Sequence, residues 1–191
     1  NLGLELDLAN YSGAVHPADP RAAFFARLFE IHPIHREAGL GAMRAAGGEL
    51  PYYHKLSVEV GTWIRTHPLD FLLLSARHFA QFYLPPLWFW YTYGHLGLVA
   101  RLQHFLVLLS SVGGICTLAF MAWRRRAYVY LLTAALMCSA PYVFVQPTLR
   151  YRYLISSLLI FLAFGGAGLL MHQFVKRRSS RNPAENVLEK T

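Results

Sequence analysis

Acidic residues are almost absent from the second half of this chain. Residues 1–95 carry eight Asp or Glu against seven Lys or Arg, whereas the remainder carries two acidic residues against eleven basic ones. A protein that binds nucleic acid would present its basic residues as one face of a folded domain, but here they gather at the ends of apolar segments. The uneven charge argues against a nucleic-acid partner and favours a lipid bilayer, whose anionic heads attract such clusters.

Cysteine and the common catalytic signatures are also scarce. The two cysteines, Cys116 and Cys138, fall within apolar segments, so the sequence offers neither a disulfide framework nor a Cys-x-x-Cys motif. It contains no nucleophile elbow, P-loop or dinucleotide-binding fingerprint. Acids such as Asp7, Asp19 and Glu30 are isolated rather than paired, and we expect most of them to be solvated. We therefore expect no cofactor.

One histidine string needs separate treatment. His32, His35 and Glu37 follow a His-x-x-His-x-Glu pattern. Pro33 interrupts the helix that would align the two imidazoles on one face. We therefore expect no metal site here.

Three long apolar runs dominate the rest of the chain. They cover Leu102–Trp123, Ala127–Gln146 and Tyr153–Val175. Each approaches the roughly 20 residues that a helix needs to cross a hydrocarbon core about 30 Å thick. These runs predict an all-α integral membrane protein in which residues 96–175 form three transmembrane helices.

Basic clusters mark alternate ends of these runs. Arg124–Arg126 follows the first run and Lys176–Arg178 follows the third, so the positive-inside rule places both in the cytoplasm. Residues 1–95 then lie on the extracytoplasmic side, and residues 176–191 form a cytoplasmic basic tail that we expect to be disordered. Because no signal peptide precedes residues 1–95, we expect an upstream transmembrane part of the same chain to carry them across.

Residues 1–95 show shorter, amphipathic patterns. Residues 1–20 contain several helix breakers, and we expect a loop there. Helical spacing of apolar side chains predicts helices over Arg21–Ile31, Tyr52–Thr66 and Leu69–Tyr83. The glycine-rich stretch over residues 39–48 leaves room for one weak helical turn.

Residues 69–93 leave two interpretations open. They are long enough for a fourth span, which would move residues 1–68 to the cytoplasm. Arg77 would then lie near the middle of the membrane, at a cost of roughly 3 kcal/mol, and Pro85–Pro86 would break the helix. A helix that lies flat at the membrane interface, followed by an aromatic belt over residues 88–93, explains the pattern better.

Glycines also cluster inside two of the apolar runs. Gly113 and Gly114 lie in the first, and Gly165, Gly166 and Gly168 lie in the third. Small residues let helices approach closely in lipid. Ordinary packing explains them better than a specific dimer motif.

Arg150-Tyr151-Arg152, at the outer end of the third run, is the sharpest candidate site. Arginine forms bidentate hydrogen bonds to phosphate, and a lipid-linked phosphate presents its head at this depth. The two arginines could hold a lipid phosphate or pyrophosphate, or they could snorkel to the phosphates of ordinary lipids. His67, between two amphipathic helices, could contact the substrate or simply cap a helix end.

Several of these motifs together resemble a known family. They are Trp63-Ile64-Arg65-Thr66-His67-Pro68-Leu69-Asp70-Phe71, Arg77 and an aromatic run, then Arg150-Tyr151-Arg152-Tyr153 at the start of a span, with Leu4-Glu5-Leu6 to Asn10 and His16-Pro17 before them. The pattern is similar to the C-terminal region of bacterial glycosyltransferase family 39-type membrane proteins. These belong to the GT-C superfamily, alongside protein O-mannosyltransferases and the aminoarabinose transferases of lipid A. The likeness covers nearly all of residues 1–175 and departs at Leu154, where many members have proline.

The resemblance implies an enzyme of the bacterial plasma (inner) membrane. It would use a polyprenyl-phosphate sugar donor on the extracytoplasmic face, with inversion at the sugar carbon. The family's catalytic carboxylate lies in a first extracytoplasmic loop that is not part of this sequence, so no catalytic residue is carried over. Arg150 and Arg152 are carried over as contacts to the donor phosphate, and Tyr151 and His67 complete the predicted site.

A non-enzymatic multi-pass membrane protein is the alternative function. It could be a subunit of a lipid or polysaccharide transporter, or a membrane anchor. A transporter would carry ionisable residues or broken helices at mid-membrane. The apolar runs are nearly free of charge, with Pro141 as their internal breaker, which argues mildly against transport.

Overall fold

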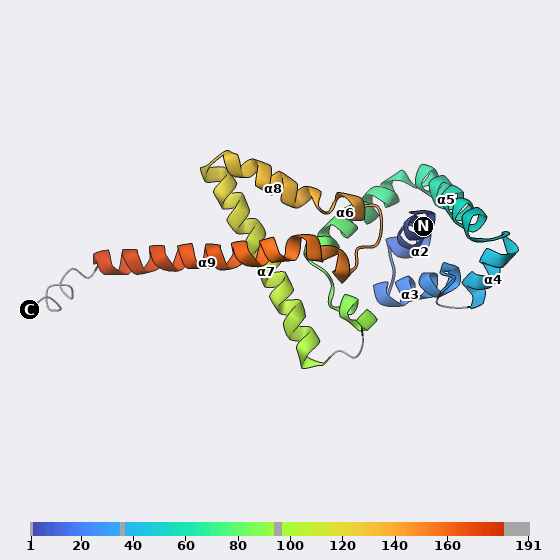
Figure 1. Ribbon diagram of the computed structural model, residues 1–191, viewed down its shortest axis with the longest axis horizontal. Helices are drawn as coiled ribbons and strands as arrows, with labels where there is room; N and C mark the ends of the chain where they lie inside the picture. Colours follow the sequence, from blue (N-terminus) through green and yellow to red (C-terminus); the bar gives the residue numbers. More distant parts are fainter. Residues whose placement is uncertain (1, 35–36, 94–96, 182–191) are drawn as a thin grey trace, which may run out of the picture. The chain divides into compact units, whose positions relative to one another are not determined.

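A computed structural model describes residues 2–34, 37–93 and 97–181. Every regular element within these ranges is a helix (Figure 1), which confirms the predicted all-α class. The chain divides into two compact units. Unit 1 comprises Asn1–His95 with Cys138–Tyr151, and unit 2 comprises Leu96–Met137 with Arg152–Thr191. The structure thus adds residues 138–151, which we had expected within the membrane segment, to the N-terminal unit.

Unit 1 is built from short and medium helices. They are α1 (Leu2–Ala9), α2 (Ser12–Val15), α3 (Pro20–Ile31), α4 (Glu37–Ala45), α5 (Glu49–Thr66) and α6 (Pro68–Tyr83), with the 3₁₀ helices η1 (Leu87–Tyr93) and η2 (Ala140–Tyr142). The helices predicted from apolar spacing are confirmed as α3, α5 and α6. Where we predicted one weak helical turn within residues 39–48, the structure has the nine-residue helix α4.

The loop expected over residues 1–20 was wrong, because α1 and α2 occupy most of it. Leu4 and Leu8, one turn apart on α1, belong to a core cluster with Leu28, Tyr52 and other apolar side chains of α3 and α5. Gly3 lets α1 approach α5 closely, since a Cβ there would lie 2.4 Å from the Tyr53 carbonyl oxygen. Packing against a partner helix therefore stabilises a helix of eight residues, which is too short to be stable alone.

An ion pair inside unit 1 makes Asp7 an exception to the expectation that most acids are solvated. Asp7 is 3% exposed and accepts hydrogen bonds from the Arg27 guanidinium, which also donates to Glu30 at 2.8 Å. Burial raises the pKa of Asp7, and the bonds from Arg27 oppose that rise. Asp7 is therefore a buried, paired carboxylate rather than a solvated one.

The second segment of unit 1, residues 138–151, is joined to its helices by polar contacts. Asn10 Nδ2 donates a hydrogen bond to the Phe144 carbonyl at 2.7 Å. His78 Nδ1 donates to the Val143 carbonyl at 3.2 Å. Gln146 Nε2 donates to Gln81 Oε1 at 2.9 Å. The rings of Phe82 and Tyr142 stack at 5.5 Å. These contacts make residues distant in sequence parts of one packed unit.

Helix α6 presents its polar side chains inward and much of its apolar surface outward. Leu69 and Leu72 are 78% and 62% exposed, and Leu73 and Phe79 are also exposed, whereas His78 is 2% exposed. A helix on the surface of a water-soluble protein shows the opposite arrangement. The apolar face of α6 is therefore left uncovered by the described residues.

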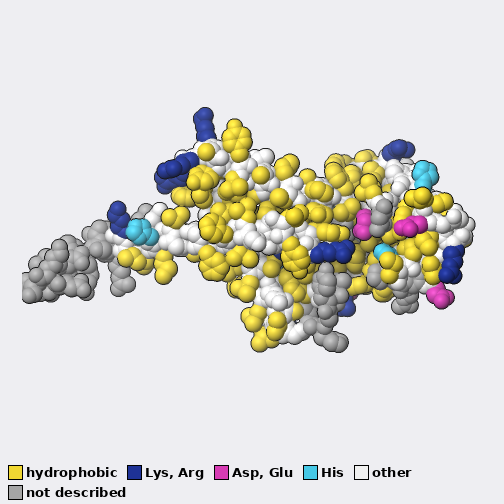
Figure 2. Space-filling view, viewed as in Figure 1, with side chains coloured by type: hydrophobic (Ala, Val, Ile, Leu, Met, Phe, Trp, Pro, Cys, Tyr) yellow, Lys and Arg dark blue, Asp and Glu magenta, His cyan; other side chains and the backbone are white. Residues whose placement is uncertain are grey.

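Unit 2 contains the long apolar helices α7 (Leu98–Arg124) and α9 (Tyr153–Arg181), with the shorter α8 (Ala127–Met137) between them in sequence. Helices α7 and α9 have 27 and 29 residues, or about 40 Å each. Both are long and apolar enough to cross a membrane. The visible surface of this unit is mostly hydrophobic, and basic side chains gather at the connection between α7 and α8 (Figure 2).

Helix α8 differs from the predicted second span, Ala127–Gln146. It has 11 residues, or about 16 Å, and ends at Met137. Pro141 explains that end, because a proline ring clashes with the carbonyl four residues earlier and lacks the N–H that would bond to it. The chain continues through η2, which contains Pro141.

Helix α9 also departs from the predicted boundaries. It continues as helix through Lys176 to Arg181, into the segment that we expected to be a disordered tail. The remainder of that predicted tail, residues 182–191, lies outside the described residues. The basic cluster after the third run is therefore attached to a continuous helix at least as far as Arg181.

Candidate functional site

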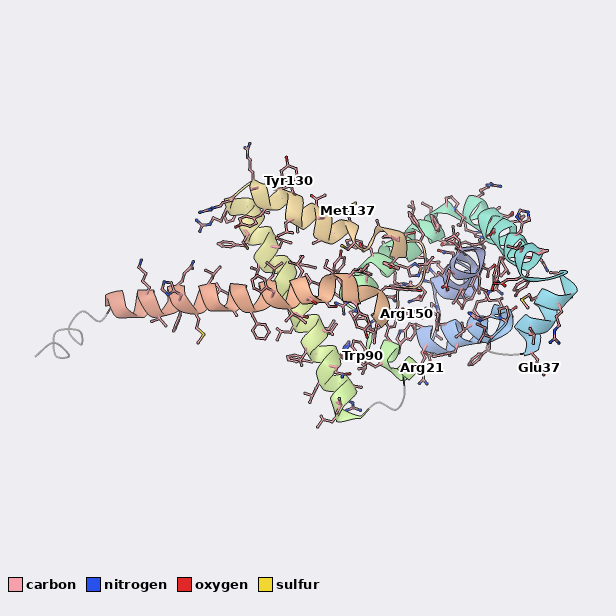
Figure 3. The ribbon with its side chains drawn as sticks, in the orientation of Figure 1. Arg21, Glu37, Trp90, Tyr130, Met137 and Arg150 are labelled. Carbon is pink, nitrogen blue, oxygen red and sulfur yellow. The ribbon has the colours of Figure 1, made fainter. Side chains whose placement is uncertain are left out.

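Arg150 lies in the 3₁₀ turn η3 (Leu149–Arg152), just before α9 in the chain (Figure 3). Its guanidinium carbon is 5.2 Å from the centroid of the Tyr151 ring, and the side chain is exposed. Tyr151 in turn stacks on Tyr142, with centroids 4.4 Å apart and planes inclined by 16°. The Tyr151 ring, which is itself held by Tyr142, therefore supports the Arg150 side chain.

The positive charge of Arg150 affects the pKa of Glu5 on α1. Burial raises the pKa of Glu5, and the positive charge of Arg150 opposes that rise. An anion bound at Arg150 would therefore compete with a carboxylate of α1 for the same positive charge.

Arg152 occupies a different environment. It is 3% exposed and donates to Ser111 Oγ of α7 at 2.5 Å, and its carbonyl accepts a bond from Ser156. Burial of a guanidinium among apolar helices is costly unless polar groups accept its hydrogen bonds. The predicted pair is thus divided between an exposed arginine of unit 1, Arg150, and a buried one of unit 2, Arg152.

His67 acts as a structural cap at the junction of α5 and α6. Its Nδ1 lies 3.1 Å from the Trp63 carbonyl and 2.8 Å from Thr66 Oγ1, and its ring stacks on Trp63 at 5.2 Å. These contacts agree with the helix-capping alternative. Both side chains that contact the His67 ring, Trp63 and Thr66, belong to the last turn of α5.

The histidine string yields no ligand cluster. His35 lies outside the described residues, and His32 Nδ1 accepts a hydrogen bond from the Ile34 amide at 3.2 Å. Within the described ranges, no group of three or more His, Cys, Asp or Glu side chains is arranged to hold a metal ion.

A cavity of about 490 Å³ lies entirely within unit 1. Its polar lining consists of Tyr11, His16, Arg77, His78, Gln81 and Gln146, and its aromatic lining includes Phe24 and Trp88. The cavity volume falls in the range of about 300–1,000 Å³ that is typical of small-molecule sites. All of its lining side chains are described, and none of them is acidic.

Arg77 fixes one side of this cavity. It donates to the carbonyl oxygens of Ala14 and Val15 at 2.8 and 2.7 Å. Both carbonyls belong to the last turn of α2, whose C-terminal carbonyls have no partner within the helix. Arg77 thereby attaches α2 to α6 and keeps its remaining N–H groups as donors.

His78 supplies a neutral imidazole. Because the Val143 carbonyl can only accept, His78 Nδ1 must carry the proton, which leaves Nε2 as a hydrogen-bond acceptor. Burial, the hydrogen bond to the Val143 carbonyl and the nearby charge of Arg77 together set the pKa of His78 at about 4, with burial as the largest cause, Arg77 acting in the same direction and Val143 opposing both. The ring is therefore uncharged at neutral pH.

The two glutamines add both kinds of hydrogen-bonding group. Gln146 Nε2 donates to Gln81 Oε1 at 2.9 Å. Among the described residues, nothing occupies the amide hydrogens of Gln81 or the amide oxygen of Gln146. The cavity thus presents donors and acceptors side by side, together with aromatic surface.

Sequence patterns gave only part of this cavity. Arg77 was identified as a charged residue of a predicted interfacial helix, but nothing in the sequence pattern indicated that it would line a cavity. Gln146 was placed at the end of an apolar span. Phe89 and Trp90, from the predicted aromatic belt, are 4% and 8% exposed and so pack within the protein, and the side chains of Tyr91 and Tyr93 lie outside the described ones.

Comparisons with known proteins provide no template for either arrangement, so the family resemblance stays a prediction. No protein-family model matches this chain, and no curated protein or solved structure is significantly similar to it.

Proposed function

We propose that this chain is the C-terminal part of a membrane-embedded glycosyltransferase that uses a polyprenyl-phosphate-linked sugar donor. One observation carries the proposal. Arg152 is buried at the start of an apolar helix with a hydroxyl of α7 as its hydrogen-bond acceptor. An ionisable side chain at such a position marks a functional site more often than a structural one.

A lipid phosphate suits the chemistry of this segment. Guanidinium groups bind phosphate through paired charge-assisted hydrogen bonds, and a polyprenyl chain would be soluble among the apolar helices. Arg150, whose guanidinium lies over the ring of Tyr151, would bind the phosphate. Arg152, two residues further along the chain, would add a second positive charge.

The chain path favours three membrane crossings, although only α7 and α9 have the full length. Residues on both sides of the α7–α8 hairpin belong to unit 1, as the bonds from His78 to Val143 and from Asn10 to Phe144 require. If α7 crosses the membrane, the segment Ala127–Tyr142 must cross back. Of that segment, α8 is regular helix for about 16 Å, so the crossing would be short, and a bilayer thins locally to match a short span.

Helix α6 would then lie at the membrane interface. Its exposed leucines, Leu69, Leu72 and Leu73, would enter the boundary between headgroups and acyl chains. Its polar face would stay with unit 1 on the extracytoplasmic side, and Arg124–Arg126 would lie in the cytoplasm. The orientation and the inner-membrane location belong to the proposal.

Thermal protection by a lipid phosphate tests the phosphate site. A ligand at one hundred times its Kd stabilises a binder by about 2.7 kcal/mol. We expect polyprenyl phosphate, but not the corresponding polyprenol, to raise the unfolding temperature of the full-length protein in nanodiscs. Arg150→Ala and Arg152→Ala should each weaken that protection by about tenfold or more in ligand concentration, since each removes a charge-assisted bond.

Arg125→Ala is the matched control, because it removes an exposed arginine from the α7–α8 connection. It should leave protection unchanged. Equal protection by polyprenol, or loss of protection in Arg125→Ala alone, would contradict the site and favour the membrane-anchor alternative.

Cysteine labelling tests the three crossings. Single cysteines would replace Lys55, Arg125 or Phe144 in a chain whose native cysteines are serine. We expect a membrane-impermeant maleimide to label the cysteines at 55 and 144 in intact cells, and the one at 125 only after permeabilisation. Labelling of all three from one side would refute this topology.

A further inference from the structure

We propose that the cavity of unit 1 is a binding site for a sugar ring, whose hydroxyl groups contact His78, Gln81 and Gln146. This site is distinct from the phosphate site at Arg150 and Arg152. It rests on the proposed glycosyltransferase function only in that the sugar would be part of a substrate. Binding itself is argued from the cavity.

The arrangement of hydrogen-bond donors and acceptors in the cavity indicates which class of ligand it binds. The amide hydrogens of Gln81 are donors, whereas the Gln146 amide oxygen and His78 Nε2 are acceptors. A hydroxyl group both donates and accepts, so neighbouring hydroxyls of a sugar satisfy both kinds. A phosphate or a carboxylate can only accept hydrogen bonds. Bound here, it would leave the Gln146 amide oxygen and His78 Nε2 without a donor.

The charges of the side chains that line the cavity also favour a neutral ligand. Two N–H groups of Arg77 are directed at the backbone carbonyls of Ala14 and Val15, and no acidic side chain is among the residues that line the cavity. A cationic ligand would therefore find no counter-ion. His78, fixed by Val143, contributes a neutral acceptor rather than a second positive charge.

Aromatic surface completes the site. Trp88 and Phe24 line the cavity, with their ring centroids 5.6 Å apart. The electron-rich face of an aromatic ring attracts the weakly positive C–H groups on the apolar face of a pyranose. The cavity, at about 490 Å³, has room for one or two such rings.

Direct binding of neutral sugars tests the proposal. The probes are methyl glycosides of common hexoses and pentoses, with inorganic phosphate as the anionic comparison. Saturation-transfer NMR would be recorded on the full-length protein in lipid nanodiscs, because maltoside detergents present a competing sugar. We expect at least one neutral methyl glycoside to bind and inorganic phosphate not to displace it.

Two variants locate the binding. Gln81→Leu keeps the side-chain size but removes the amide, and it should weaken glycoside binding by about tenfold or more, because a buried partner group is left unsatisfied. Ala23→Phe fills the cavity from α3 and should abolish binding while the protein keeps its helical circular dichroism. Gln103→Leu, at an exposed position of α7, is the matched control and should bind normally.

The outcomes separate this proposal from the phosphate site. Loss of glycoside binding in Gln81→Leu and Ala23→Phe, with polyprenyl phosphate still protecting both, supports the sugar site. Unchanged binding in both variants overturns it, as does displacement of the glycoside by phosphate or the absence of any glycoside binding to the unmodified protein. None of these three results would affect protection by polyprenyl phosphate.

Discussion

The contact between α7 and α9 depends on a glycine at one position, and this gives the sharpest prediction. A Cβ built on Gly114 would lie 2.6 Å from the carbonyl oxygen of Leu159 and 2.8 Å from its Cα. Both atoms belong to the backbone of α9, so no side-chain rotation can relieve the overlap. Gly114→Ala must therefore push the two helices apart.

Two opposing effects set the magnitude. Overpacking of this kind costs about 1–3 kcal/mol, and the better helix propensity of alanine returns up to about 1 kcal/mol. We expect Gly114→Ala to lower the free energy of unfolding by about 1–2 kcal/mol. Gly166→Ala should cost less, because the nearest atom, Thr117 Oγ1 at 2.0 Å, belongs to a side chain that can rotate.

Gly165 provides the matched control, since no atom lies within 4 Å of a Cβ built there. Gly165→Ala should be neutral or slightly stabilising. Reversible unfolding in mixed micelles with increasing SDS, followed by circular dichroism, would measure all three variants. Equal stability of Gly114→Ala and Gly165→Ala would refute the close approach of α7 and α9.

Three further predictions concern unit 1. Asp7→Asn should lower the free energy of unfolding by about 2 kcal/mol, because Arg27 loses a buried partner while keeping Glu30; thermal unfolding measures this. Asp19→Ala should cost about 1 kcal/mol in the same assay, since Asp19 Oδ1 accepts from the Arg21 and Ala22 amides at the start of α3. His78 has its pKa lowered to about 4, below its unfolded value of about 6.5. The unfolded state therefore binds more protons between these values, so stability should fall, by up to about 3 kcal/mol, as the pH drops from 6.5 to 4. His78→Gln should remove this pH dependence, and a slope that persists would assign it to another group.

Local patterns predicted those elements whose stability is local. Arg21–Ile31 and Leu69–Tyr83 combine helical spacing with a proline at or before the first turn, and both proved to be helices. The loop prediction for residues 1–20 was wrong because the helices there depend on packing. Gly3 is a poor helix former by itself, but it permits the close contact between α1 and α5. A tertiary contact of this kind leaves no periodic signal.

The candidate site shows the same limit. Arg150 and Arg152 are two residues apart and look equivalent in the sequence. In the structure, however, Arg150 is exposed, whereas Arg152 is buried and donates a hydrogen bond to Ser111. Composition cannot indicate which arginine a distant serine will meet. Pro141 did signal a break in the second run, but the return of residues 138–151 to unit 1 depends on contacts more than sixty residues away along the chain, such as that of His78 with Val143.

That return has a consequence for biosynthesis. Asn10 and His78 find their acceptors at Phe144 and Val143, so unit 1 cannot close until the ribosome has made α7 and α8 as well. Contacts of such long sequence separation slow folding, and during the delay the buried polar groups of α1 and α6 would lack partners. If the α7–α8 hairpin crosses the membrane as proposed, its insertion would bring the second segment of unit 1 back to the first and so control when unit 1 can fold. A chain cut at residue 95 would lack residues 138–151, which complete that unit.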